Sequence, residues 1–77
     1  MQLELYGTVS CHLCDEAKAV LQGACICAAH IDITVTEELL EKYGMRIPVL
    51  RRVDSGAELG WPFDAAAVTR FLARLAE

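Results

Sequence analysis

Two cysteines separated by two residues, Cys11 and Cys14, are the part of the sequence best suited to chemistry. If this stretch begins a helix, the spacing places Cys14 one turn beyond Cys11 on the same side, close enough for a disulfide. Free N–H groups and the positive dipole end favour a thiolate at a helix N-terminus. We therefore expect Cys11 to be the exposed attacking thiolate and Cys14 the partly buried thiol that resolves a mixed disulfide. A metal site and a pair of small buried side chains remain as alternatives.

A second pair, Cys25 and Cys27, follows the predicted helix in an alanine-rich segment. Residues two apart in an extended segment point to the same face, and we expect both to be buried as small apolar side chains. A second redox pair, a regulatory thiol and a metal site stay open for them. A zinc site made by all four cysteines would need a spacing unlike the common zinc motifs. We expect His30, just beyond, to face solvent.

The elements that must position these cysteines follow from hydrophobic periodicity. Residues 3–6 predict a short strand that ends at Gly7. A helix then runs from Cys11 to about Gly23, with Ser10 as its N-cap. The apolar stripe expected on this helix consists of Leu13, Ala17, Val20, Leu21 and Ala24.

The remainder of the chain alternates strands and helices. Apolar and polar residues alternate over 31–35, which predicts a half-buried strand at a sheet edge. Thr34 or Thr36 caps a helix that ends at Gly44. Pro48 opens a third strand, a turn over 54–56 joins it to a short strand over 57–60, and Asp64 caps a last helix. The expected helix faces are Leu39, Leu40 and Tyr43 in the first, and Val68, Phe71, Leu72 and Leu75 in the second.

The predicted order is therefore β-α-β-α-β-β-α, an α/β fold. Its first half is a right-handed β-α-β unit with parallel strands, and its second half is a hairpin followed by a helix. We expect a four-stranded mixed sheet flanked by helices on both faces. A chain of 77 residues and 8.5 kDa suits one domain over residues 1–77 with one modest core.

Composition excludes several classes of function. Eleven acidic residues against seven basic ones give a net charge of −4, which argues against nucleic acid and anionic lipid as partners. The N-terminus lacks a basic segment before an apolar run, and the longest uncharged stretch, residues 19–31, is too short to cross a bilayer. We expect a cytoplasmic monomer with no membrane segment. In the cytosol a close cysteine pair more often cycles or binds metal than forms a structural disulfide.

Three motifs in this order resemble the small bacterial glutaredoxin-like proteins of the thioredoxin superfamily. They are residues 11–17 (CHLCDEA), 43–49 (YGMRIPV) and 58–61 (ELGW). The resemblance covers essentially the whole chain. It implies a thioredoxin-like, glutaredoxin-type fold and a thiol–disulfide oxidoreductase, an electron carrier of cell redox homeostasis, acting through Cys11 and Cys14.

The resemblance also implies roles for single residues. Pro48 matches the family's cis-proline, which faces the active-site disulfide and tends to exclude a metal from it. Ile47 would offer its backbone N–H and C=O to an extended substrate. His12 and Leu13, between the cysteines, join this predicted substrate-binding set. Its remaining members are Gly60, Trp61 and Asp64.

Glutathione as a co-substrate stays open. Relatives that bind it carry a lysine shortly before the first cysteine, where this chain has the residues GTVS at 7–10. In the segment that meets the γ-glutamyl end, Gly60 and Asp64 match, but Trp61 and Phe63 replace a small and a polar residue. Asp64 also has a simpler role as a helix cap, and Trp61 as a partly buried cover or a stacking surface. Arginines at positions 46, 51 and 52 offer a carboxylate partner instead.

We expect no bound cofactor and no metal. The expected partners are a disulfide-containing protein or a glutathione mixed disulfide. One alternative is a dedicated redoxin for ribonucleotide reductase that is recharged by thioredoxin reductase, which suits the missing lysine. An alternative from a different class is a non-catalytic zinc-binding or interaction domain.

Overall fold

A computed structural model describes residues 2–9 and 11–73. Its elements, in chain order, are β1 (Leu3–Gly7), α1 (His12–Gly23), β2 (Ala29–Asp32), a 3₁₀ helix (Ile33–Val35), α2 (Glu37–Tyr43), β3 (Val49–Arg52), β4 (Glu58–Gly60) and α3 (Ala65–Ala73). The predicted order of strands and helices is confirmed. Among the described helices, none is both long enough and apolar enough to cross a membrane.

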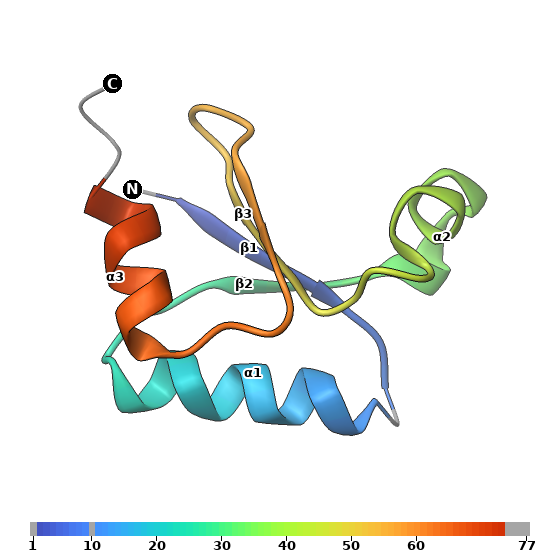
Figure 1. Ribbon diagram of the computed structural model, residues 1–77. Helices are drawn as coiled ribbons and strands as arrows, with labels where there is room; N and C mark the ends of the chain where they lie inside the picture. The colour runs from blue at the N-terminus through green and yellow to red at the C-terminus, as the bar shows by residue number, and fades with distance from the viewer. Residues whose placement is uncertain (1, 10, 74–77) are drawn as a thin grey trace.

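The four strands form one mixed sheet in the order β2-β1-β3-β4 (Figure 1). Strand β1 runs parallel to β2 and antiparallel to β3, and β3 pairs antiparallel with β4. The parallel pair is joined through α1, as a β-α-β crossover requires. Strand β2 lies at the sheet edge, as predicted.

Each face of the sheet has its own apolar cluster, because successive strand residues point to opposite faces. Leu5 and Leu50 pack against α1 and α3 on one face. Tyr6 and Val49 pack with Tyr43 of α2 on the other face, where the two tyrosine rings lie 4.4 Å apart. Helices therefore cover both faces of the sheet, and α1 is held against the face that carries Leu5.

The second predicted strand ends earlier than the alternation suggested. Strand β2 stops at Asp32, and residues 33–35 form the 3₁₀ helix instead. The Asp32 carboxylate accepts the Thr34 N–H at 2.9 Å and the Thr34 hydroxyl at 2.7 Å. This local cap competes with continued strand pairing, a habit of aspartate and threonine that periodicity alone does not reveal.

The three predicted helices are confirmed, with local corrections to their caps and buried faces. Thr36, and not Thr34, caps α2 by accepting the Leu39 N–H at 3.1 Å. Leu40 is 49 % exposed, so the buried face of α2 depends on Tyr43 with Leu39 partly buried beside it. In α3, Val68 and Phe71 are buried as predicted. Leu75 lies outside the described residues.

Candidate active site

Cys11 is the N-cap of α1. Its backbone is extended, with φ −102° and ψ 110°, and its Sγ accepts the Cys14 N–H at 3.2 Å. The Cys11 carbonyl also accepts the Asp15 N–H at 3.2 Å, which starts the helical ladder. The prediction that Ser10 caps this helix is therefore wrong, because Cys11 is the N-cap. Ser10 itself lies outside the described residues. The sulfur of Cys11 occupies the position where helix N–H groups and the dipole stabilise negative charge.

Cys14 lies directly behind Cys11 and is only 1 % exposed. It belongs to the buried face of α1 with Ala17 and Leu21. Gly7, at the end of β1, makes room for it: a Cβ on Gly7 would lie 2.8 Å from the Cys14 Sγ. Glycine is required here because β1 and α1 approach each other across this sulfur.

Burial controls the protonation of Cys14. Loss of hydration is the largest cause that raises the pKa of the Cys14 thiol, to about 11, and the hydrogen bond shared with Cys11 raises it further. A backbone hydrogen bond at Thr8 and the positive charge of Lys18 act in the opposite direction. The two thiols are thus unequal: Cys14 is held protonated behind a half-buried Cys11 at the helix end.

Pro48 lies beside this pair by register. Tyr6 pairs with Val49, so the antiparallel ladder, extended by one residue, sets Pro48 opposite Gly7. The side-chain alternation that sends Leu50 toward α1 sends Pro48 to the same face. Pro48 is fully buried and follows a cis peptide bond from Ile47, as the resemblance implied. The sheet therefore brings Pro48, Gly7 and Cys14 together at one end.

Ile47 departs from its expected role in one respect. Its backbone N–H already donates to the Tyr43 carbonyl at 3.1 Å, because the chain between α2 and β3 folds back on the last helical turn. That N–H is not free for a substrate, which corrects the prediction. The Ile47 carbonyl remains the backbone group that an extended substrate would meet.

His12 and Leu13 are the exposed residues of the first helical turn. The His12 side chain is 89 % exposed and lies 3.8 Å from Glu16. Leu13 is 43 % exposed, which corrects its placement in the buried stripe of α1. Met45, just before β3, is fully exposed, a feature that the sequence analysis did not single out.

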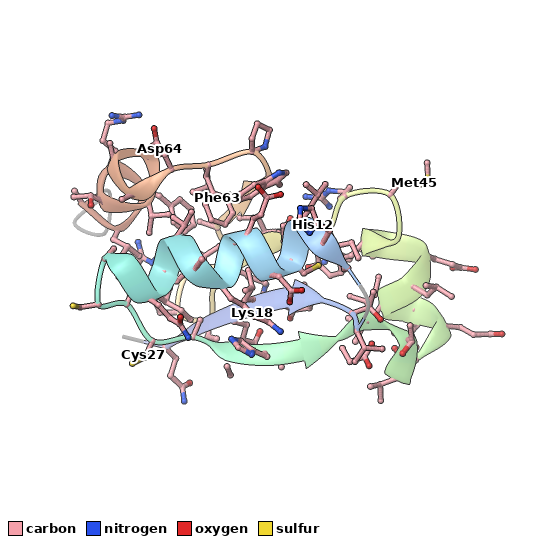
Figure 2. The ribbon with its side chains drawn as sticks, turned by 90° about the horizontal axis from the view of Figure 1, so that it is seen from below. His12, Lys18, Cys27, Met45, Phe63 and Asp64 are labelled. Atoms are coloured by element: carbon pink, nitrogen blue, oxygen red, sulfur yellow. The ribbon has the colours of Figure 1, made fainter. Side chains whose placement is uncertain are left out.

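In the segment after β4, Trp61 contacts Pro48 beside the dithiol, whereas Asp64 lies further away (Figure 2). Half-buried Trp61 packs edge-to-face on Phe63, with ring centroids 5.0 Å apart. The backbone N–H of Trp61 donates to the Pro48 carbonyl at 3.2 Å. Gly60 is open, with no atom within 4 Å of a Cβ placed there. A second cis peptide bond, between Trp61 and Pro62, was not expected. Trp61 is thus connected to Pro48 through the backbone.

Asp64 caps α3, as predicted, by accepting the Ala67 N–H at 2.8 Å. Figure 2 shows Asp64 above the C-terminal half of α1, whereas His12 lies at the first turn of that helix. A ligand that touches both Asp64 and the dithiol must therefore be extended.

Cys25 and Cys27 follow the other end of α1 and are both exposed. Figure 2 shows Cys27 at that end, away from His12. The expectation that the two cysteines fill a buried packing site is wrong. Cys25 has φ +58°, a left-handed conformation that ends α1. Ile26, between the two cysteines, packs against the core, and the cysteines on either side of it face solvent. Within the part of the chain that the structure describes, no three His, Cys, Asp or Glu side chains converge as metal ligands.

Comparisons with known proteins agree with this architecture. The X-ray structure of target protein XcR50 from X. campestris has 40 % sequence identity and a TM-score of 0.86, covering 94 % of this chain and 96 % of that one. Protein Ne2328 from Nitrosomonas europaea has 28 % identity and a TM-score of 0.70, covering 91 % and 88 %. Thioredoxin 1 from Thermosipho africanus, at 15 % identity and a TM-score of 0.58 over the full length of both chains, shares the fold.

No curated protein sequence matches this chain significantly. The model of one family, the Glutaredoxin-like domain (DUF836), matches residues 2–73. The mixed four-stranded sheet, its helices on both faces and the thioredoxin-fold neighbours fit that match. This chain belongs to the Glutaredoxin-like domain (DUF836) family, and it has the thioredoxin fold.

Proposed function

We propose that this chain is a thiol–disulfide oxidoreductase in which Cys11 attacks and Cys14 resolves. One observation carries the proposal: Cys11 caps α1 with its sulfur on the Cys14 N–H, and Cys14 is buried directly behind it. An accessible sulfur at a helix N-terminus is suited to act as a thiolate nucleophile. A buried neighbour one turn away is suited to close the ring once the first sulfur is in a mixed disulfide.

The reaction balances in two exchanges. The Cys11 thiolate attacks a substrate disulfide, forms a mixed disulfide, and releases one substrate thiolate, which takes up a proton. Cys14 then loses its proton and attacks the Cys11 sulfur, which releases the second substrate thiolate. The two substrate sulfurs gain two electrons, and the Cys11–Cys14 disulfide that remains has lost them.

The substrate side of the site is proposed to be the surface beside Ile47 and Pro48. Pro48 lies opposite Gly7 by register, and the Ile47 carbonyl is available to an extended segment. His12 and Leu13 border it as exposed residues, with Trp61 connected through the Pro48 carbonyl. This arrangement supports a disulfide in an extended peptide as substrate, because backbone pairing and flanking apolar contacts both suit one.

The proposal has two versions, which differ in the reductant that recharges the dithiol: glutathione in the first and a thioredoxin reductase in the second. Glutathione would span from the dithiol toward Gly60 and Asp64, but the three arginines in and just before β3 already pair with carboxylates of this chain. Arg46 pairs with Glu58 at 2.8 Å, Arg51 with Glu4 at 3.4 Å, and Arg52 with Asp54 at 2.6 Å. These internal ion pairs, with the missing lysine before Cys11, favour a thioredoxin reductase as the source of electrons. A dedicated donor to ribonucleotide reductase, acting in the cytoplasm, is one form of that second version.

An assay separates the two reductants. Reduction of a small glutathione mixed disulfide is measured with glutathione and glutathione reductase, and again with thioredoxin reductase. Turnover only with thioredoxin reductase would support the second version. Equal turnover with glutathione alone would establish glutathione as the co-substrate.

Single cysteine substitutions test the dithiol itself. We expect Cys11→Ser to abolish reduction of insulin or of a mixed disulfide, because the nucleophile is lost. Cys14→Ser should still form a mixed disulfide with substrate but fail to release it. Cys25→Ser and Cys27→Ser, matched controls at the other end of α1, should keep full activity. Equal loss in the controls would contradict the assignment of the working pair.

A zinc-binding domain is the rival from another class. It would need thiolates that converge, whereas α1 separates Cys11 and Cys14 from Cys25 and Cys27. Titration of free thiols and bound zinc in the purified protein decides the question. Four free thiols after unfolding, without bound zinc, support the redox proposal, and stoichiometric zinc that protects all four in the folded protein would refute it.

A further inference from the structure

A cavity of about 120 Å³ borders Cys14 on the side of strand β2. Thr8 closes one side of it, Lys18 of α1 lines a second side, and His30 and Asp32 of β2 line a third. Figure 2 shows Lys18 on the side of α1 away from Asp64 and Phe63, above the strands. The volume holds a few water molecules. The cavity is open to solvent at His30, which is exposed, and at Lys18, whose side chain is 39 % exposed.

The cavity lies on the opposite side of β1 from Ile47 and Pro48, the proposed substrate side. Strand order places β2 on one side of β1 and β3, which follows Pro48, on the other. A peptide bound along Ile47 and Pro48 therefore leaves the β2 side of Cys14 uncovered. Any proton that Cys14 releases while Cys11 is occupied by substrate has a path on this side.

Few charged groups face Cys14 from the elements packed against it. Cys11 faces it from the helix end, Lys18 from one turn further along α1, and His30 and Asp32 from β2 across the cavity. The Thr34 backbone and hydroxyl are the main causes that lower the pKa of Asp32, so this carboxylate stays ionised and cannot take up the proton. Lys18 is the cation of the set, and its exposed partner Asp15 lies 3.9 Å away.

This inference rests on the proposed function, in which Cys14 must lose its proton and become a thiolate before it can resolve the mixed disulfide. We propose that Lys18 is the positioning residue that stabilises the Cys14 thiolate in this step, and that the cavity between α1 and β2 is the route by which the proton leaves.

The chemistry of the step is balanced. The Cys14 S–H bond breaks, and its proton passes through the cavity to water. The new Cys14–Cys11 bond forms as the bond between Cys11 and the substrate sulfur breaks, and the departing thiolate takes a proton from solvent. Lys18 keeps its own proton throughout and contributes only its charge, which offsets the ionised Asp32 on the other side of the cavity.

A two-step titration separates this inference from the proposed function. The reduced protein, with Cys25→Ser and Cys27→Ser to remove the exposed thiols, reacts with a nitroaromatic disulfide that releases a coloured thiolate. The first release reports attack by Cys11, and the second reports resolution by Cys14. Both rates are followed as functions of pH.

In Lys18→Gln we expect an unchanged first release, while the midpoint of the second moves up by ~0.5–1 pH unit, a shift reduced by the exposure of Lys18. Near neutral pH the second release then slows by ~3–10-fold, since each pH unit is tenfold in thiolate. Lys18→Arg should restore the midpoint. Arg70→Gln, an equal loss of charge at an exposed position of α3, should leave both releases unchanged.

Each result bears on one of the two ideas. A normal first release with an unshifted second release in Lys18→Gln overturns the role of Lys18 alone, as does an equal shift in Arg70→Gln. Absence of the first release in the parent protein overturns the proposed function and this inference with it.

Discussion

At the N-terminal end of α1, Cys11 caps the helix and Cys14 is 1 % exposed; at the C-terminal end, Cys25 and Cys27 are both exposed. At the first pair, Gly7 leaves room for the Cys14 sulfur, and the Cys14 N–H donates a hydrogen bond to the Cys11 sulfur. At the second pair, Cys25 adopts φ +58° just after the helix. Two pairs of one residue type thus have opposite surroundings within one helix length.

The helix itself explains much of the contrast. Its N-terminus offers unpaired N–H groups and positive dipole charge, which stabilise a thiolate. Its C-terminus offers carbonyl oxygens and negative dipole charge, which disfavour one. Position on the helix, more than the number of cysteines, therefore separates a pair suited to redox work from a pair of ordinary surface thiols.

Alkylation of the reduced, folded protein tests this contrast with the largest effect. We expect Cys14 to react with iodoacetamide at least 100-fold more slowly than Cys27. A pKa of about 11 instead of the ordinary 9.0 leaves a hundredfold less thiolate, and burial slows the reaction further. Peptide mass spectrometry over time gives each rate, and unfolding in urea should equalise them. Equal rates in the folded protein would contradict the difference in burial.

Two glycine substitutions compare the packing near the two ends of α1. Gly7→Ala places a Cβ 2.8 Å from the Cys14 Sγ, so we expect a loss of about 1–3 kcal/mol in unfolding free energy and impaired dithiol activity. Gly23→Ala, in the last turn of α1, meets no atom within 4 Å and should gain up to about 1 kcal/mol. Urea titration measures both. A neutral Gly7→Ala would show that Cys14 shifts without cost.

The sequence predicted the placement of Cys11 and Cys14 at the start of a helix because the signal for it is local. A cysteine spacing of one helical turn, placed after a strand, needs no tertiary information to be recognised. Order of elements, the edge position of β2 and the Asp64 cap were likewise predictable from patterns within a few residues. The cis-proline at Pro48 came from the resemblance and not from periodicity.

The second pair was misplaced because its signal is not local. Small residues around Cys25 and Cys27 suggested packing, but after the left-handed turn at Cys25 it is Ile26 that packs against the core, and both cysteines are exposed. The Ile47 N–H was misassigned for a similar reason: its partner, the Tyr43 carbonyl, depends on how α2 returns toward β3. The cavity beside Cys14 is tertiary as well, since Lys18 and His30 meet only when α1 packs over the sheet.

The pH dependence of stability should differ between variants of the two pairs. The Cys14 pKa is raised in the folded state, so the stabilisation from its neutral form is present below pH 9.0 and lost as pH rises through about 11. In the reduced protein we expect this loss to be about 1–2 kcal/mol. Cys14→Ala should lack that part of the loss, and Cys27→Ala should keep it. Tyr6, with a pKa of about 12, adds a loss common to all variants.

The control for this measurement is the oxidised protein, in which Cys14 has no proton to lose. Its unfolding free energy should fall less over the same pH range than that of the reduced protein. A fall of the same size in Cys14→Ala and in the parent would show that tyrosine ionisation alone accounts for the alkaline loss.

The smallest expected effect concerns the backbone at the second pair. Cys25 holds φ +58°, a conformation that costs an ordinary side chain about 1 kcal/mol relative to glycine. Cys25→Gly should therefore raise the unfolding free energy by up to about 1 kcal/mol, without affecting activity. Cys27→Gly is the matched control, since Cys27 is not in the left-handed region and should lose about 0.5–1 kcal/mol through chain entropy. Gains or losses of the same sign in both variants would mean that the turn at Cys25 is not strained. In that case the end of α1 at this position would need another cause than the left-handed conformation of Cys25.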